Sequence, residues 1–416
     1  MAEINVKNEI GQLKEVLVHR PGNELLNLTP EKLHDLLFDD IPYLKIAQKE
    51  HDKFVTALKN NGVRVYYLED LMAETLNFNP NIKEQFLKQF IKEAGVYTPK
   101  YRDLVFDYLI NIVDNKKFVL KTMEGVQIYE LDQNKRINDK SLVDLITDES
   151  EFILEPMPNL YFTRDPFASI GEGIAINKMA SNTRFRETIY SEYIFSYHPK
   201  FKNKVEKYYQ RYNKWHIEGG DILNLNDHIL AIGISERTEA GAIDCLARNL
   251  FKNPNCNIDI VLAFNIPKIR SFMHLDTVFT QVDFDKFVYH PGIMAALKVF
   301  EITESHDSDS TEDLSVLELN DSLENILNRY LDIKSILIPC ANSDSIASKR
   351  EQWNDGTNTL CIAPKKVIVY DRNNITNEVL KSYGIEVIEI PGSELSRGRG
   401  GPRCMSMPLV REKVPK

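Results

Sequence analysis

The sequence has little of several features that define common protein classes. Its 416 residues include five cysteines, an odd number scattered along the chain. That is no disulfide framework, and it fits a reducing compartment. No apolar run reaches the roughly 18 residues that a membrane-spanning helix needs. The first residues lack the basic and apolar blocks of a signal peptide. These absences predict a cytoplasmic protein without a membrane segment.

Excess positive charge is also missing. The net charge of −10 argues against a nucleic-acid partner bound through its phosphates. The sequence contains no Walker loop, no dinucleotide-binding glycine motif, no EF-hand loop and no zinc-ligand spacing of Cys and His. We therefore expect no cofactor and no metal. Hydrophobic residues at 43% and charged residues at 27% are typical of a globular chain, here one large or two medium domains.

The apolar pattern separates a helical block from strand-rich segments. The runs KEQFLKQFIKEAG, YRDLVFDYLINIVD and KSLVDLITD repeat apolar residues at the helical period. We expect an all-helical domain over residues 71–148, inserted into an α/β domain formed by residues 1–70 and 149–416.

A plan of strand, turn, strand and helix recurs in the α/β part. It occurs in NLYFTRDPFASIGEGIAI before RFRETIYSEYIF, GGDILNLNDHILAIGISERT before EAGAIDCLARNLF, HLDTVFTQVDFDKFVYHPG before IMAALKVF, and TNTLCIAPKKVIVYDR before NEVLKSYG. The opening LKEVLVHRPG with the helix after it could be a fifth copy. Such repetition suggests one unit used several times around an axis. An ordinary mixed α/β sheet yields similar strings, so the pattern alone leaves both architectures open.

Cys404 is a candidate nucleophile. It follows several glycines in GRGGPRCMSMP, and glycines let a backbone approach a ligand closely. Arg403 is adjacent, and Arg397 and Arg399 are near. Positive charge lowers the pKa of a thiol and favours the reactive thiolate. A single cysteine in a tail is nevertheless more often without function.

A histidine and several carboxylates stand at the ends of predicted strands. His274 and Asp276 in FMHLDTVFT are two residues apart, so they would share one face of a strand, and histidine moves protons near neutral pH. Glu218 and Asp221 flank a Gly-Gly pair in WHIEGGD, and Asp165 precedes a proline in LYFTRDPF. Each could be purely structural. If the repeated units surround one axis, these groups converge, and several carboxylates suit a cation with several N–H donors.

Two arginines begin predicted helices. Arg184 lies in NTRFRET and Arg237 in SERTEA, where positive charge is unfavourable for the helix dipole. Binding of an anion would explain them, because a guanidinium matches a carboxylate. Many arginines at such positions are merely solvated.

Seven segments in order make the chain resemble the arginine deiminases of the guanidine-modifying superfamily, nearly end to end. They are IGQLKEVLVHRPG, LLFDDIPYL, NLYFTRDPFASIG, HIEGGDIL, SERT, MHLDTVFT and RCMSMP. The resemblance implies a five-bladed α/β propeller of pseudo-fivefold ββαβ units with an inserted helical domain. It also implies hydrolysis of free L-arginine to L-citrulline and ammonia through a covalent thiouronium intermediate, in a homodimer or higher homo-oligomer.

The resemblance also implies roles for residues. Cys404 matches the nucleophile, His274 the general acid and base, and Glu218 the carboxylate that pairs with the histidine. Asp165 and Asp276 match the carboxylates that hold the guanidinium. The residues that match substrate-binding positions are Asn159, Phe162, Arg184, Arg237 and, in a part of its loop that varies among relatives, Arg399.

Other activities share part of this set. An amidinotransferase or a dimethylarginine hydrolase has similar Cys, His and carboxylates, but the paired arginines and the helical block favour free arginine. A peptidyl-arginine deiminase would need no grip on a substrate carboxylate. A cysteine peptidase leaves the guanidinium-holding aspartates unexplained. From a different class, a non-catalytic arginine-binding or surface-interaction protein is the main alternative, and the intact set disfavours it.

Overall fold

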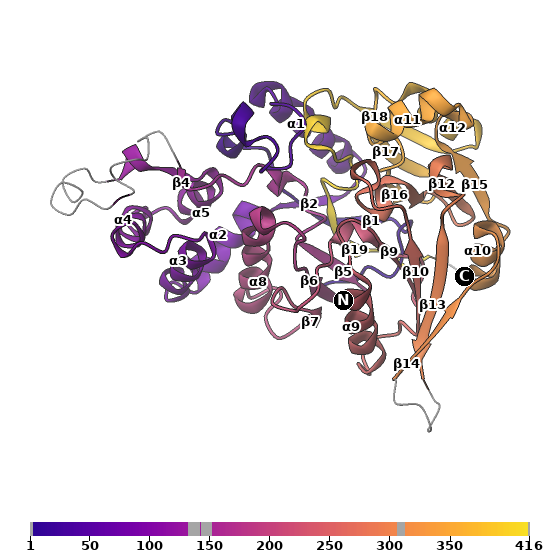
Figure 1. Cartoon of the computed structure of the whole chain (residues 1–416), viewed down its shortest axis with the longest axis horizontal. Helices are drawn as coiled ribbons and strands as arrows, with labels where there is room; N and C mark the ends of the chain where they lie inside the picture. The colour runs from indigo at the N-terminus through magenta and orange to yellow at the C-terminus, as the bar shows by residue number, and fades with distance from the viewer. Residues whose placement is uncertain (1–2, 132–141, 143–151, 306–312, 415–416) are drawn as a thin grey trace.

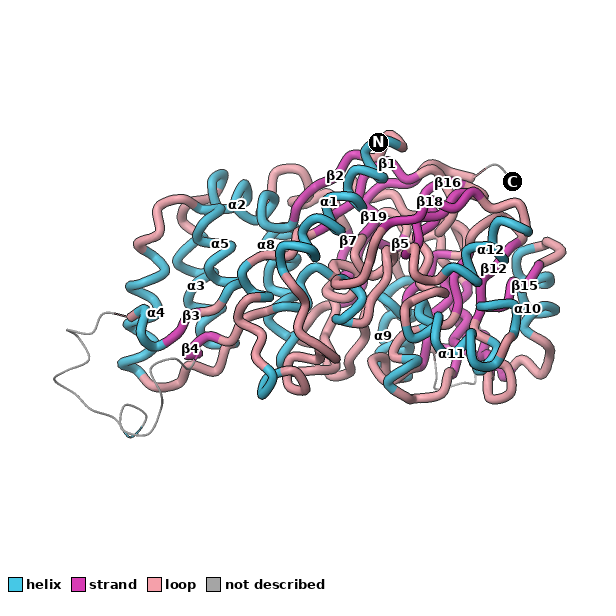
Figure 2. Tube along the Cα trace, turned by 90° about the horizontal axis from the view of Figure 1, so that it is seen from above, coloured by secondary structure: helices cyan, strands magenta, loops and turns pink. Residues whose placement is uncertain are grey.

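The computed structural model describes residues 3–131, 142, 152–305 and 313–414. The molecule is elongated, with a group of helices at one end and a strand-rich body at the other (Figures 1 and 2). The fold is mixed α/β. Among the described residues no helix has both the length and the apolar character that a membrane crossing requires.

Five sheets in the described residues repeat one connection. In each, two strands pair antiparallel, a helix follows, and a third strand returns parallel to the second. The strand trios are β19 (Met407–Arg411), β1 (Leu13–Val18) and β2 (Arg64–Tyr67); β5 (Phe167–Ile170), β6 (Gly173–Ile176) and β7 (Glu206–Tyr209); β8 (Ile222–Asn224), β9 (Ile229–Ile234) and β10 (Ile260–Asn265); β11 (Phe279–Gln281), β12 (Lys286–Tyr289) and β15 (Ile336–Pro339); and β16 (Leu360–Ala363), β17 (Lys366–Tyr370) and β18 (Glu386–Ile390). The helices that precede the third strands are, in the same order, α1 (Leu44–Asn60), α8 (Thr188–Tyr197), α9 (Ala240–Phe251), α10 (Leu323–Leu331) and α12 (Asn374–Ser382).

The first of these sheets joins the two ends of the chain. Strand β19 near the C-terminus pairs antiparallel with β1 near the N-terminus, with Leu17 opposite Met407. Residues of β1 and of the segment before β19 belong to one hydrophobic cluster, which includes Val16, Val18 and Met405. This pairing fixes Cys404, three residues before β19, in the interior of the molecule.

Four helices lie in the described part of the region predicted to be helical. They are α2 (Leu68–Phe78), α3 (Ile82–Glu93), α4 (Pro99–Ile110) and α5 (Asn115–Glu124), at the left in Figure 1. Pro99 occupies the first turn of α4, and the Asp114 side chain caps α5 by accepting from Lys117 N at 2.9 Å. A short strand pair follows, β3 (Val126–Gln127) with β4 (Phe152–Leu154), which an all-helical block does not include.

One hydrophobic cluster continues from these helices into the neighbouring sheet. Phe86 and Phe90 of α3 pack against Tyr190 and Tyr193 of α8. The separation of residues 71–148 as a domain therefore stays a prediction. The expected helix in KSLVDLITD lies outside the described residues, apart from Leu142.

The predicted helix in IMAALKVF is wrong. Residues Pro291–Ile293 form one 3-10 turn, and the end of the run begins strand β13 (Lys298–Glu304), which pairs antiparallel with β10. Strand β14 (Leu314–Glu318) extends that sheet, and one further helix is α11 (Ser345–Trp353). The continuation KVFEITE is rich in β-branched and aromatic residues, and its pairing with β10 overrides the short apolar run.

Candidate active site

Each repeated sheet places a polar residue in the segment before its first strand. These residues are Asp165 before β5, Glu218 before β8, His274 and Asp276 before β11, Asn358 before β16 and Cys404 before β19. All are buried. The contacts described below show that these five segments meet at one place, so residues separated by up to about 240 positions form one site.

His274 and Glu218 form a buried, hydrogen-bonded pair of ionisable groups in the site. His274 Nε2 lies 2.8 Å from Glu218 Oε2, and Nδ1 lies 3.9 Å from Asp165 Oδ1. Burial opposes a charged imidazole, but the negative charges of Asp165, Glu218 and Asp221 outweigh it and raise the pKa of His274 to about 9. At neutral pH His274 is therefore a cation.

Cys404 is held on three sides. Its backbone N donates to Asn358 Oδ1 at 3.0 Å, and its carbonyl accepts from Arg164 N at 3.1 Å. The thiol Sγ lies 3.7 Å from Asp276 Oδ2. The backbone is thus fixed independently of the side chain, and the thiol is directed toward a carboxylate.

The expected lowering of the Cys404 pKa is wrong. Burial, together with the charges of Asp276, Asp165 and Asp355, raises the pKa of this thiol well above its usual range. The opposing charge of Arg403 is neutralised locally, because its Nη1 donates to Asp276 Oδ2 at 2.7 Å. Without a bound cation, Cys404 is a neutral thiol.

The two other arginines of this loop direct their charge elsewhere. Arg397 forms an ion pair with Asp40. The Arg399 guanidinium lies 3.5 Å from the ring centroid of Trp353, and its Nη1 is 3.7 Å from Asp39 Oδ2. Arg397 and Arg399 are therefore close to Cys404 in sequence but do not stabilise its thiolate.

Asp165 and Asp276 each present an unused oxygen. Oδ2 of Asp165 accepts from Arg184 Nη1 at 2.8 Å, and Oδ2 of Asp276 accepts from Arg403. The two Oδ1 atoms are buried and have no hydrogen-bond partner in the described structure. A buried carboxylate oxygen without a donor costs free energy. A cation that brings N–H donors would relieve both.

A cation could also be held elsewhere in the same cluster. Asp165, Glu218 and His274 have ligand-type atoms within 4.8 Å of one another. Oxygen and nitrogen donors of this kind suit either a metal ion or an organic cation. Asp276 lies outside this group, so a metal ion bound there would leave the unpaired oxygen of Asp276 unexplained.

Arg184 and Arg237 form ion pairs with buried carboxylates of the site. Arg184 donates to Glu187 from Nε at 3.0 Å and from Nη2 at 2.9 Å, and its Nη1 binds Asp165. Arg237 Nη1 is 3.4 Å from Glu218 Oε2. All three nitrogens of Arg184 are engaged, so Arg237 has more capacity for a further anion.

Asn159 and Phe162 connect the site to two covering segments. Asn159 Nδ2 donates to Leu36 O at 2.7 Å. The Phe162 ring packs on Tyr161, with centroids 4.0 Å apart. A Cβ at Gly400 would lie 2.3 Å from the Phe162 ring, so this glycine lets the loop over residues 397–403 close on that ring.

The Gly-Gly pair of HIEGGD makes room for the histidine. A methyl group on Gly220 would lie 2.6 Å from Nδ1 and 2.7 Å from Cγ of His274. We expect Gly220→Ala to displace the imidazole and to lower kcat by about 100-fold, the cost of a misplacement near 1 Å. Steady-state kinetics with circular dichroism would measure this.

A distant glycine supplies the control for that experiment. Gly384 has a φ of +77° and no atom near an added Cβ, so Gly384→Ala strains the backbone outside the site. It should lower the melting temperature and leave kcat unchanged. Equal kcat values for Gly220→Ala and the wild-type protein would show that the imidazole is not confined by this contact.

The reasoning from local sequence was wrong about the geometry of one pair of residues and did not identify another residue of the site. His274 and Asp276 do not share a strand face, because His274 precedes a 3-10 turn (Leu275–Thr277) and β11 begins later. Asn358, which contacts Cys404 and donates to Asp276 O at 3.2 Å, was not predicted. Its position before the first strand of a repeated unit, in TNTLCIAPKKVIVY, could have indicated it.

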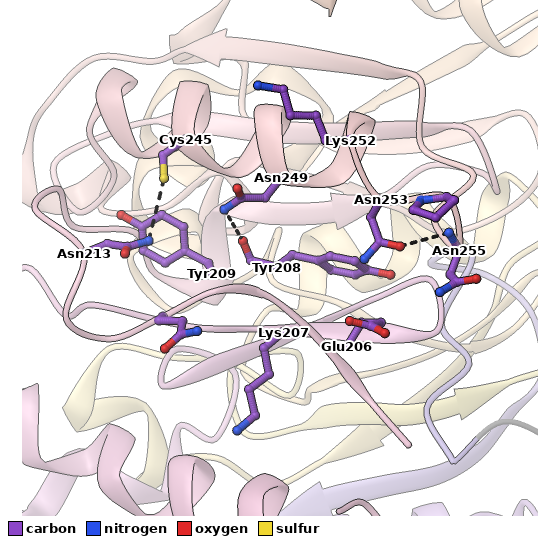
Figure 3. A pocket seen from close by; sticks show the side chains of 12 residues that line it. Glu206, Lys207, Tyr208, Tyr209, Asn213, Cys245, Asn249, Lys252, Asn253 and Asn255 are labelled. Atoms are coloured by element: carbon purple, nitrogen blue, oxygen red, sulfur yellow. Dashed lines mark hydrogen bonds between the residues drawn. The ribbon is translucent and has the colours of Figure 1, made fainter. Parts of the chain in front are cut away.

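A groove outside this site lies between β7 and α9 (Figure 3). Its volume of about 710 Å³ would admit an amino acid, but its lining has one carboxylate, Glu206, one thiol, Cys245, and no histidine. Asn249 and Asn213 are already bonded to Tyr208 O and the Cys245 thiol. This groove lacks the charges that the site around Cys404 provides.

Comparison with known proteins identifies close relatives along the whole chain. The family model described as arginine deiminase matches residues 34–411. The arginine deiminase of Treponema denticola is 56% identical over 415 residues, with 100% of both chains covered. That of Clostridium perfringens is 52% identical over 412 residues, covering 99% of this chain and 98% of the relative.

Solved structures with lower identity share the fold. SxtG, an amidinotransferase from Microseira wollei in the saxitoxin biosynthetic pathway, aligns with a TM-score of 0.54 at 16% identity, covering 99% of this chain and 98% of that one. The N-terminal domain of ArgZ, covalently bound to a reaction intermediate, aligns with a TM-score of 0.53 at 13% identity, covering 96% and 99%. These likenesses support the α/β architecture alone. The family model and the sequence identity over full length show that this chain belongs to the arginine deiminase family.

Proposed function

We propose that the chain hydrolyses free L-arginine to L-citrulline and ammonia through a covalent intermediate on Cys404. The observation that carries this proposal is the pair of buried, unpaired oxygens on Asp165 and Asp276, next to a thiol and a protonated histidine. A planar guanidinium with several N–H donors matches two carboxylates better than a single metal ion does.

We further propose that the five repeated sheets are blades of an α/β propeller. Their shared connection and the meeting of the segments before their first strands support it. In such an arrangement the same end of every blade faces a common axis. One site can then collect a thiol, a histidine, an amide and three carboxylates from five separate parts of the chain.

Binding of the substrate would prepare the nucleophile. The guanidinium, held by Asp165 and Asp276, cancels two of the charges that, in addition to burial, hold the pKa of Cys404 high. The thiol then loses its proton to solvent, and a thiolate forms beside the guanidinium carbon. His274 is already protonated and stays available as an acid.

The chemistry then proceeds in two halves. The thiolate attacks the guanidinium carbon to give a tetrahedral adduct. His274 gives its proton to one nitrogen, the C–N bond breaks and ammonia leaves, which produces a thiouronium on Cys404. Neutral His274 next takes a proton from water as the water oxygen attacks the same carbon. The C–S bond breaks, the hydroxyl proton of the adduct passes to solvent, and neutral L-citrulline and the thiolate are released. Glu218 orients His274 throughout.

The protonation state of His274 sets the alkaline limit of activity. Its pKa of about 9 lies above its ordinary value of 6.5, so His274 remains an acid at neutral pH and loses this ability as the pH rises. We expect kcat/KM, which reports ionisations of the free protein, to fall as the pH passes about 9, and Glu218→Gln to move this limb to lower pH. A wild-type limb near pH 6.5 in pH-rate profiles would contradict this assignment.

Arg237 and Arg184 are proposed to bind the α-carboxylate of the substrate. Arg237→Ala should lower kcat/KM for L-arginine by about 10- to 100-fold, the range for a charge-assisted hydrogen bond. Agmatine, which lacks the carboxylate, serves as the comparison and should lose much less. Losses of equal size on both substrates would show that Arg237 acts through Glu218 instead.

The remaining expectations are a cytoplasmic location, assembly into a homodimer or higher homo-oligomer, and no nucleic-acid or membrane partner. The homologous relatives support a small-molecule substrate. Sedimentation of the purified protein would give the assembly state directly.

A panel of guanidines tests the proposed function against its neighbours. L-Arginine, agmatine and dimethylarginine are each incubated with the protein, with and without glycine as an amine acceptor, and the products are identified by mass spectrometry. We expect citrulline from L-arginine with the highest kcat/KM and no dependence on glycine. Dimethylamine as the main product, or product only with glycine, would assign a dimethylarginine hydrolase or an amidinotransferase.

A further inference from the structure

Asp221 is a buried carboxylate beside the site that the reaction scheme above does not use. Its Oδ1 accepts from Leu275 N at 2.8 Å, and its Oδ2 accepts from Ser235 Oγ at 2.6 Å. The Thr238 hydroxyl also favours the ionised form of Asp221 and lowers its pKa, against the larger effect of burial. The carboxylate thus receives donors from two other segments, one after β9 and one before β11.

The direction of these hydrogen bonds follows from proton counting. Ser235 Oγ accepts from the backbone N–H of Arg237 at 2.9 Å and of Thr238 at 3.1 Å, so its single proton is left for Asp221. Thr238 Oγ1 accepts from Glu218 N at 3.2 Å. An acceptor with two lone-pair-bearing oxygens is required at the end of these chains. A neutral amide has one acceptor oxygen, so it would leave either the Leu275 N–H or the Ser235 hydroxyl without an acceptor.

The segment that contains Asp221 and the two segments that donate to it carry the proposed catalytic and binding groups. Glu218 begins one, Arg237 lies in the second, and His274 directly precedes Leu275 in the third. Gly233 allows the close approach, since a Cβ there would lie 2.2 Å from Asp221 Oδ1. A carboxylate placed at the junction of three segments fixes their relative positions.

Asp221 also adds to the charge around His274. The acidic groups that face the imidazole are Asp165, Glu218 and Asp221. Burial raises the pKa of Asp221 to about 6, against the opposing effect of His274. At neutral pH Asp221 is therefore mostly ionised.

We propose that Asp221 is a positioning residue for the deiminase reaction, which locks the segments bearing Glu218, Arg237 and His274 in one arrangement and supplies negative charge to His274. This inference rests on the proposed function. It predicts two separate effects of removing the Asp221 carboxylate, one on turnover of L-arginine and one on the titration of His274.

The test compares Asp221→Asn with a matched buried aspartate. Asp283 is equally buried, in the turn between β11 and β12, and binds Lys286 at 2.8 Å, so Asp283→Asn reports the general cost of removing a buried carboxylate. We expect Asp221→Asn to lower kcat/KM for L-arginine by about 100-fold. NMR titration of labelled histidines should show the His274 pKa lowered by about one unit. Asp283→Asn should change neither.

The remaining outcomes also decide the question. Ser235→Ala and Thr238→Val each remove one of the hydroxyls near Asp221. Both should lower kcat and should disturb folding less than Asp221→Asn does. They therefore test the inference even if Asp221→Asn does not fold. Wild-type kcat and an unshifted His274 titration in Asp221→Asn, or in both single-chain variants, would overturn the inference. If the wild-type protein forms no citrulline, the proposed function fails, whereas the His274 titration still reports on Asp221.

Discussion

Replacing Cys404 with alanine should lower kcat for L-arginine by about 10⁵-fold or more, because loss of a nucleophile removes the whole covalent route. The fold should survive. The backbone of Cys404 is anchored through Asn358 and Arg164, and alanine keeps the Cβ of this buried side chain. Citrulline formation, followed together with the melting temperature, would measure both effects.

Cys245→Ala is the control for a cysteine of no catalytic importance. Cys245 lies half-buried on α9, away from the site, and its loss should leave kcat unchanged. If Cys404→Ala retained more than a small fraction of the wild-type rate, water would have to attack arginine directly. The covalent mechanism would then be wrong, although the substrate could still be correct.

Asp276→Asn should change two properties of the protein in opposite directions. Turnover should fall by about 10³-fold, since the guanidinium loses one of its two charged partners. The free thiol should become more reactive, because Asp276 is, after burial, the largest contribution to the raised pKa of Cys404. A decrease of one pKa unit would give about tenfold more thiolate at neutral pH.

Alkylation by iodoacetamide, with Cys404 followed by peptide mass spectrometry, measures the second effect. Asp355→Asn is the matched comparison, because Asp355 also raises the pKa of Cys404 but is not assigned to the guanidinium. It should speed alkylation and lower turnover much less. Slower alkylation in Asp276→Asn would mean that Asp276 activates the thiol in the free protein, and the role of the substrate cation would need to be abandoned.

The sequence predicted those elements whose signals are local. The helical period over KEQFLKQFIKEAG corresponds to α3, and the paired strands around Asn226 and Asp227 correspond to β8 and β9. The helix predicted in IMAALKVF was wrong because a short apolar run does not by itself distinguish a helix from a strand. The pairing of β13 with β10 decided the outcome, and that contact joins segments far apart in the sequence.

The site shows the same division between local and long-range causes. Residue types at particular positions pointed to Cys404, His274 and the carboxylates. The state of the thiol could not be derived that way, because the arginines near Cys404 in sequence are paired with Asp276, Asp40 and Asp39. The carboxylates that do control its pKa come from other sheets. Asn358 and Asp221 were not assigned roles for the same reason, since their partners are known only from the folded chain.

The repeated unit provides a positional rule that can be applied to the sequence alone. Every predicted catalytic group lies just before the first strand of a unit, and Asn358 occupies that position in the one unit that lacked a candidate. Aligning the copies within the chain would have placed Asn358 in the site. It would not have identified Asp221, whose role depends on the hydroxyls of Ser235 and Thr238.

The most direct test of the central claim is to incubate the purified protein with L-arginine and to quantify citrulline and ammonia together over time. The proposed function predicts equal amounts of both products, formed without added metal or acceptor and absent in Cys404→Ala. Intact arginine after many hours, or ammonia without an equal amount of citrulline, would contradict it and favour a protein that binds arginine without converting it or an enzyme with a different guanidine substrate.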